Sequence, residues 1–124
     1  MTFETDAVGA YIIRLPWPPA LSRVYGRNHR LSDEAKRFYR AVAQLIQDSD
    51  TRELPLAGKL CVEIAVSAPD VRRRDLDNLL KATFDSLEKG GVLHNDCQIK
   101  RLLMYELGVD MGGGHLDLCI TRLA

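Results

Sequence analysis

The sequence is poor in several features that mark particular classes of protein. It has three cysteines, Cys61, Cys97 and Cys119, and their spacing matches neither a zinc site nor a redox pair. An odd number of such cysteines, with no signal peptide ahead of them, predicts a protein of the reducing cytoplasm. No apolar run is long enough to span a bilayer, so we expect no membrane association.

The chain also lacks a surplus of charge of either sign. Lys and Arg together number 17, as do Asp and Glu, so the formal net charge is zero. A nucleic-acid-binding domain usually carries a basic surplus, but the distribution of charge matters more than its sum. Arginines cluster at positions 72–74 and, early in the chain, at Arg23, Arg27 and Arg30. The early cluster is interpreted either as a solvated surface or as a set of phosphate contacts.

The stretch from Arg72 to Lys81 is the one around which the rest of the chain is organised. Three arginines run directly into Asp75 and Asp77. Apolar residues then follow the 3.6-residue period of an amphipathic helix, at Leu76, Leu79, Leu80, Phe84 and Leu87. The pair Gly90-Gly91 is a typical helix stop. The two aspartates therefore lie where a helix begins, and Lys81 lies one turn after Asp77.

Two interpretations of the aspartates are open from the residues alone. In the first, Asp75 and Asp77 cap the helix and Lys81 pairs with Asp77. In the second, they hold a divalent cation, because Mg²⁺ prefers oxygen ligands and usually takes one or two carboxylates with water and substrate phosphate. Asp96, just past the glycine stop, is a candidate third carboxylate if the chain turns back toward the helix.

Periodicity predicts the other elements of the fold. Strands are expected at 10–15, 59–68, 99–107 and 116–122, and a further helix begins after the cap residue Ser32. Strict alternation indicates that strand 59–68 is half-buried, and the glycines at 112–114 predict an antiparallel hairpin of the last two strands. Together these predict one α+β domain over residues 1–124, with a mixed four-stranded sheet and two helices packed on one face. Residues 1–8 are polar enough to fray.

Taken together, these motifs resemble the RusA-type Holliday-junction resolvases, many of which are carried by phages or prophages. The resemblance lies in the run Arg-Arg-Arg-Asp-Leu-Asp-Asn-Leu-x-Lys, then Phe-Asp-x-Leu and Gly-Gly-Val-Leu-x-Asn-Asp-x-Gln-Ile, with Leu-Pro-Trp-Pro-Pro near the start. It spans nearly the whole chain. It implies that Asp75, Asp77 and Asp96 bind metal and that Lys81 is an essential catalytic residue, with Arg74 in a basic position beside the site.

The resemblance further implies a Mg²⁺-dependent endodeoxyribonuclease, for which Mn²⁺ is an alternative cation, that nicks four-way DNA junctions in recombination and repair. Paired nicks on opposed strands imply a homodimer with one site per subunit, and no small-molecule cofactor is expected. The residues expected to contact DNA phosphates are Arg72, Arg73, Arg74, Arg23, Arg27 and Arg30. The alternatives are a nuclease for flaps or forks, a non-catalytic junction-binding protein, and a sugar-nucleotide transferase, for which little chain remains.

Overall fold

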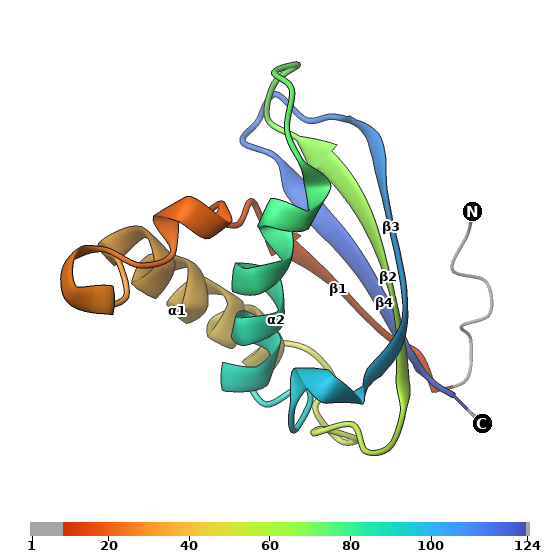
Figure 1. Ribbon diagram of the computed structural model, residues 1–124. Helices are drawn as coiled ribbons and strands as arrows, with labels where there is room; N and C mark the ends of the chain where they lie inside the picture. Colours follow the sequence, from red (N-terminus) through yellow and green to blue (C-terminus); the bar gives the residue numbers. More distant parts are fainter. Residues whose placement is uncertain (1–8, 124) are drawn as a thin grey trace.

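Four strands form one mixed sheet in the computed structural model, which describes residues 9–123 (Figure 1). The predicted fraying of residues 1–8 lies outside the described residues. The strands are β1 (Tyr11–Pro16), β2 (Leu60–Ala68), β3 (Ile99–Val109) and β4 (His115–Arg122). Helices α1 (Asp33–Gln47) and α2 (Leu80–Lys89) lie on the same face of the sheet. The predicted α+β architecture is therefore confirmed.

Helix α1 begins at the predicted cap. The Ser32 hydroxyl accepts a hydrogen bond from the backbone N–H of Ala35 at 3.0 Å. Asp33 and Glu34 occupy the first turn, where the helix dipole stabilises negative charge. The cap therefore fixes the point at which the chain leaves the basic segment at 21–30 and enters the helical layer.

Helix α2 ends at the predicted glycine pair. The N–H of Gly91 donates to the carbonyl of Glu88, and the N–H of Val92 donates to that of Leu87, which is the Schellman arrangement. Gly91 has a φ of +86°, a left-handed conformation that glycine adopts without steric cost. The chain therefore reverses at the end of α2, and Asp96 begins the short 3₁₀ turn that leads into β3.

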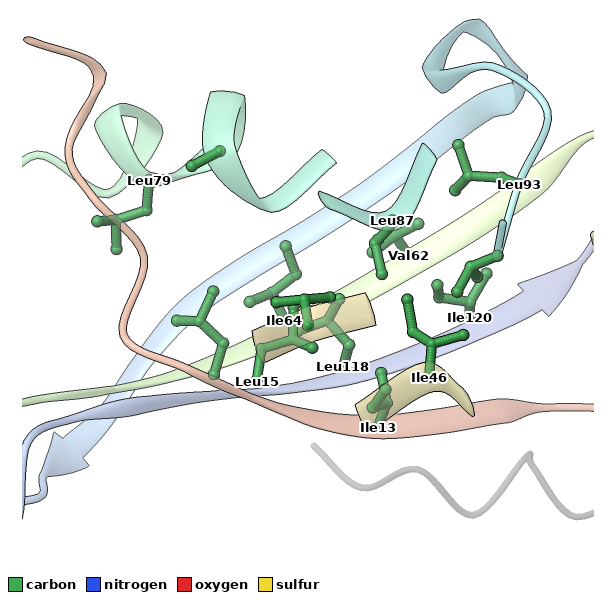
Figure 2. Packing of buried hydrophobic residues seen from close by; sticks show 14 of the residues in the cluster. Ile13, Leu15, Ile46, Val62, Ile64, Leu79, Leu87, Leu93, Leu118 and Ile120 are labelled. Carbon is green, nitrogen blue, oxygen red and sulfur yellow. The ribbon is translucent and has the colours of Figure 1, made fainter. Parts of the chain in front are cut away.

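The hydrophobic core lies between the sheet and the two helices. Alternate side chains of β1, β2 and β4 point toward both helices (Figure 2). Burying each of these large side chains stabilises the fold by about 1.5–3 kcal/mol. The residues labelled in Figure 2 are Ile13, Leu15, Ile46, Val62, Ile64, Leu79, Leu87, Leu93, Leu118 and Ile120.

The prediction that strand 59–68 is half-buried is wrong, because β2 is buried on both faces. The strand lies in the interior of the sheet, between β4 and β3. On the face away from the helices it carries Ala65, which is only 3% exposed, and whose neighbours in register are Tyr105 and Asp117. Glu63 on that face accepts a hydrogen bond from the Tyr105 hydroxyl at 3.3 Å. Larger side chains of the flanking strands therefore shield β2.

The predicted hairpin of the last two strands is also wrong. Strands β3 and β4 do not pair with each other; each pairs with β2, which lies between them. Their connection crosses the end of β2, where the N–H of Asp110 donates to the carbonyl of Ala68 at 2.7 Å. The apolar strand β2 takes the interior position because a strand with two neighbours is best shielded from water.

No helix in the described part of the chain is long and apolar enough to cross a bilayer.

Gly114 lies in the connection between β3 and β4, at the point where that connection packs against the rest of the molecule. It has a φ of +80°, and a Cβ here would lie 2.8 Å from Cδ of Pro69 and 2.9 Å from Cε3 of Trp17. We expect Gly114→Ala to lower the free energy of unfolding by about 1–3 kcal/mol in denaturant titrations. Gly108→Ala is the control, because a Cβ there meets no atom within 4 Å. Equal losses in both variants would contradict this account.

Candidate active site

Asp75 and Asp77 lie at the start of the 3₁₀ turn Leu76–Leu79, which runs directly into α2. Both side chains are exposed. Asp75 occupies the capping position, but its side chain makes no capping hydrogen bond. Within residues 9–123, neither carboxylate takes part in an ion pair or a side-chain hydrogen bond. The capping interpretation is therefore not supported, and two neighbouring carboxylates are left available, a donor set that suits Mg²⁺.

Arg74 directly precedes the acidic pair, yet its guanidinium is bound elsewhere. It pairs with Asp70 at 2.8 Å and donates to the backbone carbonyls of Asp70 and Arg72 at 3.2 Å. Its Cζ atom lies 5.4 Å from the centre of the Trp17 ring, within the range of a cation–π contact. Hydrogen bonds from the backbone and side chain of Arg72, and from Arg74, lower the pKa of Asp70 to about 2. Asp70 therefore anchors the arginine loop as a charged group at neutral pH.

An open pocket of about 420 Å³ lies beside this loop. Its lining includes Trp17, the two arginines Arg73 and Arg74, and the acidic residue Asp75. Basic and acidic groups thus share one concave surface at the start of α2. The other lining residues are Ala20, Asn78 and Leu79.

Lys81 lies one turn after Asp77, but it pairs with Asp85 instead. Its Nζ atom is 3.1 Å from Oδ2 of Asp85 and 6.0 Å from the centre of the Tyr25 ring. The hydrogen bond to Asp85 is the main cause that raises the pKa of Lys81. The ammonium group is therefore protonated at neutral pH, and it lies between α2 and the segment that carries Tyr25.

Asp96 lies at the other end of α2. Its N–H donates to Oε1 of Glu88, in the last turn of that helix, at 2.8 Å. The ten residues of α2 alone span about 15 Å at 1.5 Å per residue. No group of three His, Cys, Asp or Glu side chains within residues 9–123 is placed to hold a metal ion. One chain therefore places Asp75 and Asp77 at the start of the same turn and Asp96 at the other end of α2, so the role of Asp96 as a ligand stays a prediction.

The early arginines lie in an ordered segment made of two short 3₁₀ turns, Leu21–Arg23 and Arg27–His29. Arg23 pairs with Glu34 of α1 at 3.1 Å, whereas Arg27 and Arg30 are exposed. The first turn contacts both α2 and the turn at Leu76–Leu79. The segment therefore lies on the same side of the molecule as the acidic pair, as a DNA-contacting role requires.

Sequence reasoning missed four residues that organise this site: Trp17, Tyr39, Asp70 and Asp85. A signal existed for two of them, because Asp70 precedes Arg74 by four residues and Asp85 follows Lys81 by four. Trp17 and Tyr39 reach the site only through the tertiary fold, and no sequence spacing reveals that contact.

An acidic helix start beside a run of arginines, on a small α+β fold, is a site suited to the chemistry of nucleic-acid backbones. Comparison with known proteins gives the family. Residues 16–115 match the family model described as endodeoxyribonuclease RusA. The chain is 39% identical over 120 residues to the crossover junction endodeoxyribonuclease RusA of Enterobacteria phage 82. It is 38% identical over 120 residues to the proteins of that name in Escherichia coli K12 and Shigella sonnei.

Each of these alignments covers 94% of this chain and 98% of the relative. The chain belongs to the RusA family of endodeoxyribonucleases, so the resemblance noted in the sequence is confirmed. The relative from Enterobacteria phage 82 agrees with the expected occurrence of the family in phages.

The contact between Arg74 and Trp17 can be tested directly, because Trp17 is the only tryptophan in the chain. We expect Arg74→Ala to shift tryptophan emission to longer wavelength, since the indole loses its guanidinium neighbour. The free energy of unfolding should fall by about 1 kcal/mol. Arg73→Ala is the matched control, because Arg73 is exposed on the same loop. An unchanged spectrum in Arg74→Ala would argue against the contact.

Proposed function

We propose that the chain is a divalent-metal-dependent endodeoxyribonuclease that resolves Holliday junctions by paired symmetric nicks in DNA recombination and repair. The observation that carries this proposal is that Asp75 and Asp77, set between Arg74 and Lys81, have carboxylates with no ion-pair partner among residues 9–123. The relatives, which align over 98% of their own length, are named crossover junction endodeoxyribonucleases. The two carboxylates are ligands of the kind that Mg²⁺ or Mn²⁺ takes.

Each group of the site has a role in this chemistry. Asp75 and Asp77 would hold the cation, which supplies Lewis acidity for phosphodiester hydrolysis when bound. Lys81 would place positive charge beside the scissile phosphate, and as an ammonium it has no lone pair with which to ligate metal. Arg72 and Arg73 are exposed on the loop, where they would bind neighbouring phosphates.

Support for a dimer comes from where Asp96 lies relative to strand β3. The turn at Asp96–Gln98 runs straight into the start of β3. The acidic pair lies near the other end, because β2 runs parallel to β3, and Ala68, a few residues before Asp75, is in register with Val109. The candidate ligands thus flank opposite ends of one strand.

Strand β3 is also an open edge of the sheet. Among the described strands it is hydrogen-bonded to β2 alone, on the outside of the order β1-β4-β2-β3. Large apolar side chains on it are 40% to 64% exposed, namely Leu102, Leu103, Leu107 and Val109. A long apolar edge is a ready site for pairing with another strand. The second strand we propose is β3 of another copy of this chain.

Such a pairing would complete the set of carboxylates. When two identical strands pair antiparallel about a two-fold axis, the start of each lies beside the end of the other. Asp96 of the partner subunit would then approach the Asp75–Asp77 corner, and two equivalent sites would result. Two equivalent sites suit a four-way junction, which has two equivalent strands to be cut.

Replacing one ligand tests the metal assignment. We expect Asp77→Asn to retain binding of a synthetic four-way junction and to lose cleavage of it in Mg²⁺, because an amide is a far weaker ligand than a carboxylate. Gel-shift titrations without Mg²⁺ measure binding, and nicking assays measure cleavage, with flap and linear duplex as comparison substrates. Asp48→Asn, which removes an exposed carboxylate at the end of α1, is the control. Normal nicking by Asp77→Asn would contradict the assignment.

Mixing two inactive variants tests whether the site is shared between subunits. We expect Asp77→Asn and Asp96→Asn each to be inactive alone. A mixed dimer of the two would contain one site with both substitutions and one with neither, so nicking of one strand should return on mixing. If all three carboxylates come from one chain, every site in the mixture is damaged and no activity returns. A continued loss after exchange of subunits would therefore refute the shared site.

A further inference from the structure

Lys81 has an acidic residue four positions away on each side, Asp77 in the 3₁₀ turn ahead of α2 and Asp85 on α2 itself, and it takes the less expected one. Helical side chains lean toward the N-terminus, which would carry Lys81 toward Asp77. An acid placed four residues before a lysine also pairs better than one placed four residues after it. The structure nevertheless pairs Lys81 with Asp85, with 3.1 Å between Nζ and Oδ2.

Tertiary contacts explain this choice. The Tyr39 hydroxyl, on α1, donates to the same Oδ2 atom of Asp85 at 3.4 Å. Burial, with a contribution from Asp85, raises the pKa of Tyr39, so the hydroxyl remains a protonated donor. The Tyr25 ring lies 6.0 Å from the Lys81 ammonium. Asp85 is 20% exposed, against 42% for Lys81, so the carboxylate is the more firmly held member of the pair.

The pairing of Lys81 with Asp85 affects the acidic pair, Asp75 and Asp77. An ammonium group on Asp77 would compete with a divalent cation for the same carboxylate oxygens. Arg74, on the other side of the pair, is likewise bound to a carboxylate outside the site, Asp70 at 2.8 Å. Both flanking cations are thus held off the two carboxylates that the proposed function requires.

We propose that Asp85, held by Tyr39, is a positioning residue that keeps Lys81 away from Asp77 and so leaves the Asp75–Asp77 pair free to bind a divalent cation. This rests on the proposed function, because that function defines what the pair binds. An ordinary surface ion pair four residues apart adds little stability, and it predicts no effect on metal affinity.

The test measures Mn²⁺ binding to the full-length protein without DNA, by calorimetry or by electron paramagnetic resonance of free Mn²⁺. Asp85→Asn keeps the shape of the side chain and removes its charge, so Lys81 is released toward Asp77. We expect the dissociation constant for Mn²⁺ to rise about tenfold, within the range of coupling energies between neighbouring groups. In the Lys81→Ala background the same substitution should leave the dissociation constant nearly unchanged.

The Lys81→Ala background separates a positioning role from a simple loss of negative charge. Loss of charge would weaken Mn²⁺ binding whether or not Lys81 is present. Asp48→Asn removes an exposed carboxylate at the end of α1 and should have little effect. Tyr39→Phe removes only the hydrogen bond from the hydroxyl to Asp85, and we expect it to raise the dissociation constant for Mn²⁺ by a smaller factor. This variant replaces Asp85→Asn in the test if Asp85→Asn does not fold.

If Asp85→Asn weakens Mn²⁺ binding equally in both backgrounds, or does not weaken it in the wild-type background, the positioning role is overturned. The proposed metal site is not affected by that outcome. No Mn²⁺ binding by the wild-type chain would overturn the proposed metal site, and the inference with it.

Discussion

The candidate site depends on two carboxylates that have no partner in the described part of the chain, although cationic side chains lie on both sides of them in the sequence. Asp75 and Asp77 lie between Arg74 and Lys81, and in water such groups readily associate. The fold prevents this by giving each cation another carboxylate: Asp70 pairs with Arg74, and Asp85 pairs with Lys81. Within residues 9–123 the oxygens of both aspartates are therefore left without a cationic partner, and carboxylate oxygens are the ligands that Mg²⁺ prefers.

The sheet holds this arrangement in place from several directions. Strand β2 delivers the arginine loop, and Trp17, just after β1, lies against Arg74. Gly114, in the connection before β4, allows the chain to approach Trp17 and Pro69 closely. Helix α1 contributes Tyr39, which bonds Asp85 on α2. The loop is therefore fixed by contacts from separate parts of the chain, and this preorganisation is what a charge-stabilising site needs.

The parts of this structure that the sequence predicts correctly are those set by local patterns. The Ser32 cap, the glycine stop after α2 and the positions of all four strands follow from periodicity and from residue chemistry within a few positions. The order of the strands does not, because the choice of β2 for the interior depends on pairing between distant segments. The burial of both faces of β2 was missed for the same reason.

In the candidate site, too, local patterns were predicted correctly and contacts between distant segments were not. The run from Arg72 to Lys81 and the family resemblance located the acidic pair. A spacing of four residues, however, offered Lys81 two partners, Asp77 and Asp85. The structure shows that Asp77 lies in the 3₁₀ turn ahead of α2, whereas Asp85 lies on α2 and accepts a hydrogen bond from Tyr39. The sequence left open whether the chain turns back before Asp96. The position of Asp96 at the far end of α2 follows from the length of that helix and the direction of β3.

The direction of strand β3 connects three features that one subunit by itself does not account for. An eleven-residue edge strand carries several exposed apolar side chains, although proteins generally protect such edges. The third candidate ligand, Asp96, lies at the start of that strand, while the acidic pair lies near its end. A junction presents two equivalent strands to be cut, and one subunit offers one site. Antiparallel pairing of β3 with its own copy would cover the edge, join Asp96 to the partner's acidic pair and generate the two-fold symmetry in a single contact, which is why we favour it over contacts elsewhere on the surface.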